Sequence, residues 1–226
     1  YHQLDVVRKL LADAPVSGIG KRYLIQHSAG SGKSNSITWL VHQLIGVEKN
    51  GTAIFDTVIV VTDRRVLDKQ LRNNIKRFAQ VSSVVGAVTE GSAQLRSFLQ
   101  SGKKIIITTV QKFPFILDEI GDAHRKRKFA IIIDEAHSSQ GGRTASKMNM
   151  ALAELDNPDF SGMDDSNTNY QVNEPVEPDI EDIINQLIES RKMLKNASYF
   201  AFTATPKNKT LEIFGEPYQD GDVVKH

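Results

Sequence analysis

The sequence predicts an α/β domain built on a mainly parallel sheet with helices on both faces. Continuous apolar runs of strand length occur at 58–62, 105–108 and 129–133. Such runs indicate strands that are covered on both faces, as in a parallel sheet. Stretches with apolar residues at helical spacing separate several of the runs, and polar or basic residues follow them directly. Open α/β sheets bind their ligands at this carboxyl end of the strands.

Each further element is expected from its own apolar pattern. The first helix has apolar residues at helical spacing from Leu4 to Leu11 and is expected to stop near Pro15, because proline cannot donate a backbone hydrogen bond. The other helices are expected at 37–45, 67–78, 93–99 and 180–194, and the other strands at 23–25, 84–88 and 199–202.

The stretch 26–34, with the sequence QHSAGSGKS, is typical of a phosphate-binding loop. Gly30 and Gly32 allow the backbone to turn with positive φ, so that successive N–H groups can face phosphate oxygens. Lys33 is placed to reach the β- and γ-phosphates, and the hydroxyl of Ser34 can bind Mg²⁺. His27 stands where the general pattern has glycine, and the strand before the loop and the helix after it outweigh that departure.

Two acids, Asp134 and Glu135, directly follow the most apolar strand. Asp134 can hold Mg²⁺ directly or through water, and Glu135 can accept a proton from the water that attacks the γ-phosphate. An Asp-Glu pair that only caps a helix is the alternative. The presence of Lys33 about a hundred residues upstream favours the catalytic interpretation.

Other polar residues carry weaker predictions. The amide of Gln3 could recognise an adenine edge, or it could face solvent at the start of a helix, and the sequence does not separate the two. Arg64, Arg65 and Lys112 follow strand ends, although solvated charge explains any one of them better. The basic run 124–128 is interpreted as a solvated turn.

Composition limits the class of protein. The 226 residues suffice for one domain with a large core, include no cysteine and contain no run of 18 apolar residues, which fits a cytoplasmic protein without a membrane span. The chain does not begin with methionine and is expected to be a piece of a longer one. Its net charge is +1, but no Lys or Arg and eleven acids lie between Lys147 and Arg191. Without those eleven acids the net charge is +12, so a polyanionic partner is plausible. The acidic part, 156–179, is expected to be a mobile insertion.

Five motifs occur in an order and spacing that resemble helicase superfamily 2. They are Gly30-Ser-Gly-Lys-Ser34, Val60-Val-Thr-Asp-Arg64, Thr108-Thr-Val-Gln111, Asp134-Glu-Ala-His137 and Thr203-Ala-Thr-Pro206. The longer stretches around the first, second, fourth and fifth motifs, including His27, are similar to the DEAH-box motor of the R subunit of type I restriction endonucleases. The resemblance runs from Gln3 to about Phe214.

This resemblance implies a RecA-like ATP-binding domain that drives translocation on double-stranded DNA before cleavage by a nuclease domain. It implies that Gln3 reads adenine, that Ala29, Gly30, Ser31, Gly32, Lys33 and Ser34 bind the nucleotide, and that Ser34 and Asp134 hold Mg²⁺. Glu135 would then activate water, with Lys33 and His137 as further catalytic residues. DNA contact or coupling would fall to Arg64, Arg65, Thr109, Gln111, Lys112, Thr203 and Thr205.

The resemblance also implies partners. These are a second RecA-like domain and a nuclease domain of the same parent chain, together with modification and specificity subunits. No second motor domain is visible, so residues 1–226 are interpreted as the first motor domain alone. Two alternatives remain open, namely another superfamily 2 helicase acting on DNA or RNA, and a non-catalytic module that uses nucleotide occupancy to order an interface. A module of the second kind would have no need of Glu135.

Overall fold

The computed structural model describes most of the chain. The described residues are 2–28, 30–62, 75, 84–88, 92–122, 124–134, 194–215, 218–220 and 223–225. The predicted helices 67–78 and 180–194 and the acidic insertion 156–179 lie outside these residues, apart from Ile75 and Leu194.

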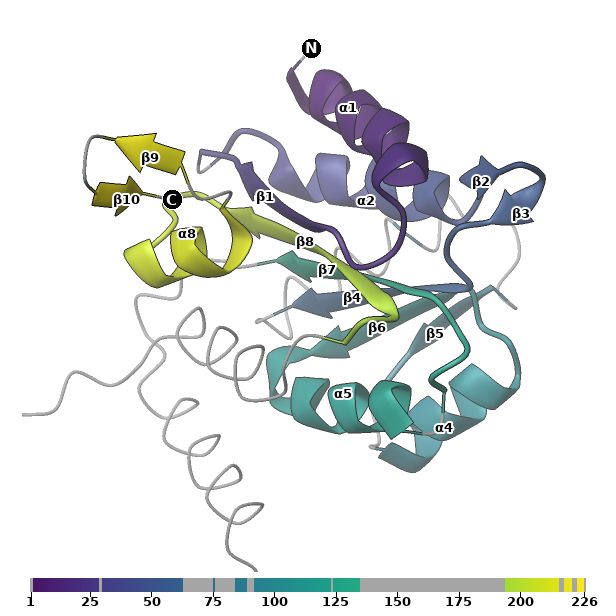
Figure 1. The fold of residues 1–226 in the computed structure, drawn as a ribbon. Helices are drawn as coiled ribbons and strands as arrows, with labels where there is room; N and C mark the ends of the chain where they lie inside the picture. Colours follow the sequence, from purple (N-terminus) through teal and green to yellow (C-terminus); the bar gives the residue numbers. More distant parts are fainter. Residues whose placement is uncertain are drawn as a thin grey trace, which may run out of the picture.

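A single six-stranded sheet organises the fold, in the strand order β1-β8-β7-β4-β6-β5 (Figure 1). All five neighbouring pairs are parallel, which confirms the predicted sheet. The strands are β1 (Arg22–Gln26), β4 (Thr57–Thr62), β5 (Val85–Ala87), β6 (Ile105–Thr109), β7 (Phe129–Asp134) and β8 (Ala197–Thr203). Every residue of β4, β7 and β8 is buried, as the continuous apolar runs predict.

Helices cover both faces of the sheet, and side chains alternate between the two faces along each strand. On one face lie α1 (His2–Ser17) and α2 (Lys33–Leu44), which pack on residues such as Val60, Ile132 and Phe200. On the other face lie α4 (Ser92–Gln100), α5 (Phe113–Asp122) and α8 (Asn208–Phe214), which pack on residues such as Val61 and Ile133. Figure 1 shows the sheet between these two helical layers.

Short elements complete the described chain. The hairpin of β2 (Glu48–Lys49) and β3 (Thr52–Ala53) turns through Asn50 and Gly51, both with positive φ. A second hairpin pairs β9 (Tyr218–Asp220) with β10 (Val223–Lys225), and the 3-10 helix η1 (Val110–Lys112) joins β6 to α5. None of the helices in the described ranges is long and apolar enough to cross a membrane.

Two local predictions were wrong. The first helix does not stop at Pro15 but continues two residues further, to Ser17, and the N–H of Gly18 donates to the carbonyl of Ala14 at 3.0 Å. The basic run 124–128 is not wholly a solvated turn. Arg127 donates hydrogen bonds to the carbonyl of Leu99 at 2.6 Å and to Oγ1 of Thr57 at 2.7 Å, so its guanidinium ties two segments together.

Gly86 explains how α4 approaches the edge strand β5. A Cβ at Gly86 would lie 2.7 to 2.9 Å from three ring atoms of Phe98 in α4, which is closer than carbon atoms pack. The absence of a side chain at this position therefore lets the Phe98 ring pack directly on the strand backbone.

We predict that Gly86→Ala lowers the free energy of unfolding by about 1–3 kcal/mol, the usual cost of overpacking. Urea unfolding measures it. Gly46→Ala is the matched control, because a Cβ there would meet only the carbonyl oxygen of Gln43 at 3.7 Å. Equal stability of the two variants would contradict the assigned packing of Phe98.

Candidate nucleotide site

The loop between β1 and α2 has the backbone that a phosphate-binding loop requires. Gly30 and Gly32 have φ values of 75° and 83°, in the left-handed region that favours glycine. The N–H of Ser31 bonds to the carbonyl of Ser28 at 3.1 Å, which closes a tight turn before the helix. Helix α2 then begins at Lys33, so its positive end faces the loop.

His27 replaces the usual glycine without backbone strain, because Asn50 is the only non-glycine residue of the described ranges with positive φ. Its ring is buried, with Nδ1 3.0 Å from Oγ of Ser31, and its backbone N–H donates to the carbonyl of Thr203 at 2.8 Å. Burial, and then the charges of His2 and Lys33, lower the pKa of His27 below its ordinary value. A neutral imidazole therefore braces the loop from within.

Helix α1 contacts the same loop from outside. The side-chain amide of Gln3 donates to the carbonyl of Ser31 at 2.6 Å, and Nε2 of His2 lies 3.1 Å from that oxygen. A Cβ at Gly32 would lie 2.0 Å from Nε2 of Gln3, so the amide rests on the glycine backbone. This contact excludes the alternative in which Gln3 only faces solvent at the start of the helix. Its contact with adenine stays a prediction.

Lys33 and Asp134 form the central contact of the site. Nζ of Lys33 lies 2.8 Å from Oδ1 of Asp134, and their side chains are only 19% and 6% exposed. Lys33 starts α2 and Asp134 ends β7, so a contact between residues a hundred positions apart joins the loop to the strand end. The geometry brings together two of the residues that the sequence assigned to one site.

The carboxyl edge of the sheet carries three further buried polar groups. Thr62, Thr108 and Thr203 end or nearly end β4, β6 and β8, and each is at most 1% exposed. None of their hydroxyls finds a hydrogen-bond partner within the described part of the chain. Because a buried polar group without a partner costs free energy, such groups call for an explanation, and a nearby ligand site is one.

Thr62 is the residue that the sequence analysis did not assign to the site. It pairs in register with Asp134 on the neighbouring strand, so the two side chains lie on the same face of the sheet, the face covered by α2. Because side chains alternate along each strand, those of Thr108 and Thr203 lie on the opposite face of the sheet. The signal available in the sequence was a hydroxyl at the end of one apolar strand and an acid at the end of another, and only the strand order makes the two neighbours.

The other predicted residues fall into two groups. Thr109 and Thr205 lie near the same edge, and Nζ of Lys112 donates to the carbonyl of Val88 at 3.1 Å, next to β5. The backbone of Gln111 lies in η1. Ala29, Arg64, Arg65, Glu135 and His137 lie outside the described residues.

The donors present fit Mg²⁺ and a phosphate chain. The carboxylate of Asp134 and the hydroxyl of Ser34 are the oxygen ligands that Mg²⁺ prefers. The ammonium of Lys33 and the loop between two left-handed glycines suit phosphate oxygens.

A parallel sheet with a glycine-rich loop and a lysine–aspartate contact at its carboxyl edge defines a RecA-like P-loop domain of the helicase kind, as predicted. The chain belongs to the SWI2/SNF2 ATPase family, whose model matches residues 2–169. The fold and the presence of a helicase-like ATPase domain are thereby confirmed.

Curated relatives agree with the resemblance seen in the motifs. The chain is 28% identical over 197 residues to the type I restriction enzyme HindI endonuclease subunit of Haemophilus influenzae, which covers 84% of this chain and 16% of the relative. It is 27% identical over 146 residues to a type I restriction enzyme endonuclease subunit of Staphylococcus aureus. That match covers 62% of this chain and 14% of the relative. The chain thus spans about a sixth of the length of the first relative and about a seventh of the second.

Solved structures show the same fold. The DEAD-box helicase Mss116 bound to ssRNA and UDP-BeF is similar with a TM-score of 0.51 and 14% identity. The match covers 92% of this chain and 37% of that one. At this identity the likeness supports the fold alone.

We predict that Thr62→Val raises the free energy of unfolding by about 1 kcal/mol, because it replaces a buried, unpaired hydroxyl with a methyl group of similar shape. Urea unfolding of the chain measures the change. The matched control is Thr57→Val at the other end of β4, equally buried. Oγ1 of Thr57 donates to the carbonyl of Lys103 and accepts from Arg127, so that variant should lose about 1–3 kcal/mol. A comparable loss in both variants would contradict the assignment of Thr62.

Proposed function

We propose that this chain is the ATP-binding motor domain of the R subunit of a type I restriction enzyme. In this role it couples ATP hydrolysis to translocation on double-stranded DNA, which precedes cleavage by a nuclease domain elsewhere in the parent protein. The observation that carries the proposal is the contact between Lys33 and Asp134 at the mouth of a loop with two left-handed glycines. The names of the curated relatives support the choice of restriction system.

The proposal assigns a role to each residue of the site. Lys33 leaves Asp134 to neutralise the β- and γ-phosphates, while the backbone N–H groups from Ala29 to Ser34 surround them. Mg²⁺, when bound, supplies further charge neutralisation to the phosphates, and Ser34 and Asp134 are the residues that would hold it. Departure of the lysine leaves the Asp134 carboxylate without its cation, which favours binding of a metal ion there.

Three further residues take supporting roles. The hydroxyl of Thr62, beside Asp134 in the sheet, is positioned to orient that carboxylate or a hydrated Mg²⁺ that the carboxylate would hold. Gln3 exchanges its contact with Ser31 for the adenine edge, or keeps both. Glu135 accepts the proton of the attacking water, which is general base catalysis by a group next to the metal ligand.

Coupling and partners complete the proposal. His137, Thr203 and Thr205 link nucleotide state to DNA contacts from Arg64, Arg65, Thr109, Gln111 and Lys112. The parent protein supplies a second RecA-like domain and the nuclease, and works in the cytoplasm with modification and specificity subunits. Because an arginine from a second motor domain is worth about 10³ to 10⁵ in rate, the isolated chain should hydrolyse ATP very slowly.

We predict that Glu135→Gln in the full-length protein keeps nucleotide binding and stops DNA-stimulated ATP hydrolysis. The substitution retains size and hydrogen bonding and removes only the base. Steady-state phosphate release, measured with duplex DNA and separately with RNA, tests both the role of Glu135 as general base and the choice of DNA over RNA. Hydrolysis within a few-fold of the parent would remove Glu135 from its role, and stronger stimulation by RNA would favour an RNA helicase.

A further inference from the structure

Basic residues gather at the amino edge of the sheet, opposite the nucleotide site. Parallel strands all begin at one edge, so the segments that precede them meet there. Lys21 precedes β1, Lys195 lies just before β8, Lys128 precedes β7 and Lys104 precedes β6. Lys103, Arg125 and Lys126 belong to the same segments. We call these seven residues the amino-edge surface.

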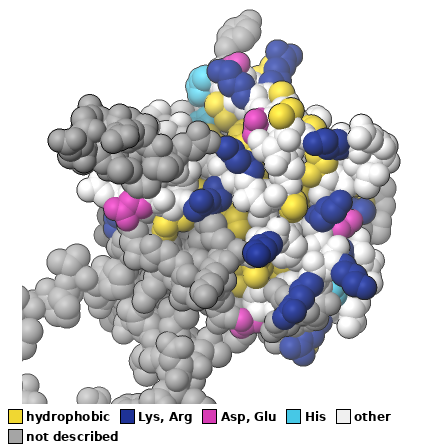
Figure 2. Space-filling model, in the orientation of Figure 1, with side chains coloured by type: hydrophobic (Ala, Val, Ile, Leu, Met, Phe, Trp, Pro, Cys, Tyr) yellow, Lys and Arg dark blue, Asp and Glu magenta, His cyan; other side chains and the backbone are white. Residues whose placement is uncertain are grey.

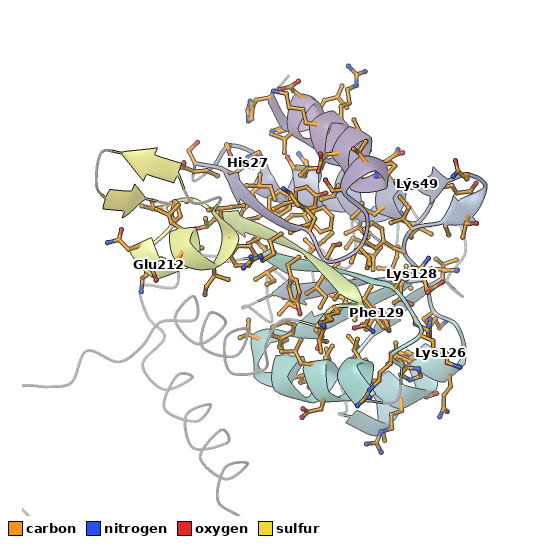
Figure 3. All side chains as sticks on the ribbon, viewed as in Figure 1. His27, Lys49, Lys126, Lys128, Phe129 and Glu212 are labelled. Atoms are coloured by element: carbon orange, nitrogen blue, oxygen red, sulfur yellow. The ribbon has the colours of Figure 1, made fainter. Side chains whose placement is uncertain are left out.

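Most of the amino-edge surface is exposed. Lys104, Arg125, Lys126, Lys128 and Lys195 are exposed, and Lys21 and Lys103 are half-buried. Among the residues directly before the six strands only Asp56 is acidic, and its carboxylate accepts the backbone N–H of Lys128 at 2.7 Å. Figure 2 shows Lys and Arg side chains spread across this view of the molecule. In Figure 3, Lys126 and Lys128 lie on the side away from His27 of the nucleotide loop.

The backbone that presents these lysines is fixed by the sheet. The carbonyls of Lys21, Lys104 and Lys128 accept hydrogen bonds from Tyr199, Val58 and Asp56, at 3.0, 2.8 and 2.7 Å. The backbone at these three lysines is therefore held along the edge of the sheet.

The turn before β7 is anchored as well. The amide of Asn196 donates to the carbonyls of His124 and Arg127, and the Arg127 guanidinium binds Leu99 and Thr57. Neighbouring strands lie about 4.8 Å apart, so the row from β1 to β6 spans about 19 Å. That length matches about five or six base pairs of a duplex at 3.4 Å each.

The chemistry of the surface favours a nucleic acid over a protein partner. Protein interfaces have an apolar core and are depleted in lysine. Here lysine dominates, and the exposed large apolar side chains in the described ranges, Leu4 and Val16, both belong to α1. A row of mostly exposed basic residues suits a phosphate backbone, which is bound by charge and by release of counterions.

We propose that the amino-edge surface binds the phosphate backbone of duplex DNA, at a place separate from the nucleotide site and its coupling motifs. The choice of duplex DNA depends on the proposed function. The surface itself does not. Such a contact would hold DNA on the outer side of the motor domain without reading its sequence, and it would be independent of nucleotide.

The test compares two triple variants of the chain with equal charge. The first is Lys104→Gln, Lys126→Gln and Lys128→Gln in the amino-edge surface. The control is Arg8→Gln, Lys9→Gln and Arg96→Gln, which removes three exposed cations from α1 and α4. Fluorescence anisotropy with a labelled 30-base-pair duplex gives the affinity across a salt series, without nucleotide. Thermal unfolding checks that both variants fold.

We expect the amino-edge variant to lose tenfold or more in affinity at low salt. Its slope of log affinity against log salt should fall by roughly 2 to 3, since each lost phosphate contact removes about 0.9. The control should stay within about twofold of the parent chain. Equal losses of DNA affinity in both variants would show that the effect comes from net charge alone, and would overturn the proposal. Binding of poly-glutamate in preference to DNA would overturn it in favour of an acidic protein partner.

A fluorescent ATP analogue separates this inference from the proposed function. Both triple variants should bind the analogue as the parent chain does, because neither touches the loop. If the amino-edge variant loses DNA affinity but still binds the analogue, the result supports the amino-edge surface, whether or not the chain is a motor domain. Loss of analogue binding in the amino-edge variant alone would show that the substitutions act through the nucleotide site, and would overturn the proposal.

Discussion

The ion pair between Lys33 and Asp134 is the contact on which the site depends. It forms because β1 and β7 are parallel and end at the same edge of the sheet, so the loop that follows one and the acid that ends the other face each other. Both side chains are largely buried. Removing one partner of a buried pair costs about 3–5 kcal/mol, because the other charge is left without compensation. The pair therefore fixes the lysine near the position where a phosphate would need it.

The loop around this pair is held from three directions. His27 braces it from within through Ser31, Gln3 and His2 contact the carbonyl of the same serine from α1, and the two glycines supply the left-handed turns. A loop that is already ordered loses little entropy when it binds a ligand, which favours affinity. The contact of Gln3 also links the first helix of the chain to the loop.

Much of the fold could be predicted from local pattern, because the buried parallel strands are continuous apolar runs and the helices have apolar residues at regular spacing. The glycines, Lys33 and Asp134 were predicted for the same reason, since phosphate chemistry demands those residue types in that order. The strand order could not be predicted. β8 is the last strand of the sheet along the chain, yet it lies between β1 and β7. Thr62 was missed because its neighbour on β7 is known only once the register is known. The hydrogen bonds of Arg127 were missed because local composition cannot distinguish a solvated arginine from an anchoring one.

The central claim is that Lys33, held by Asp134, is the cation that binds the nucleotide phosphates. Isothermal titration calorimetry of Mg·ATP with Lys33→Ala, beside the control Lys9→Ala, tests it most directly. Lys9 forms only an exposed pair with Asp5 on α1, so its loss should leave binding unchanged. Thermal unfolding must first show that Lys33→Ala still folds, with Lys33→Met, which keeps the apolar stem of the side chain, as the substitute if it does not. The account predicts no detectable heat of binding for the Lys33 variant, whereas an affinity equal to that of the parent chain would contradict it.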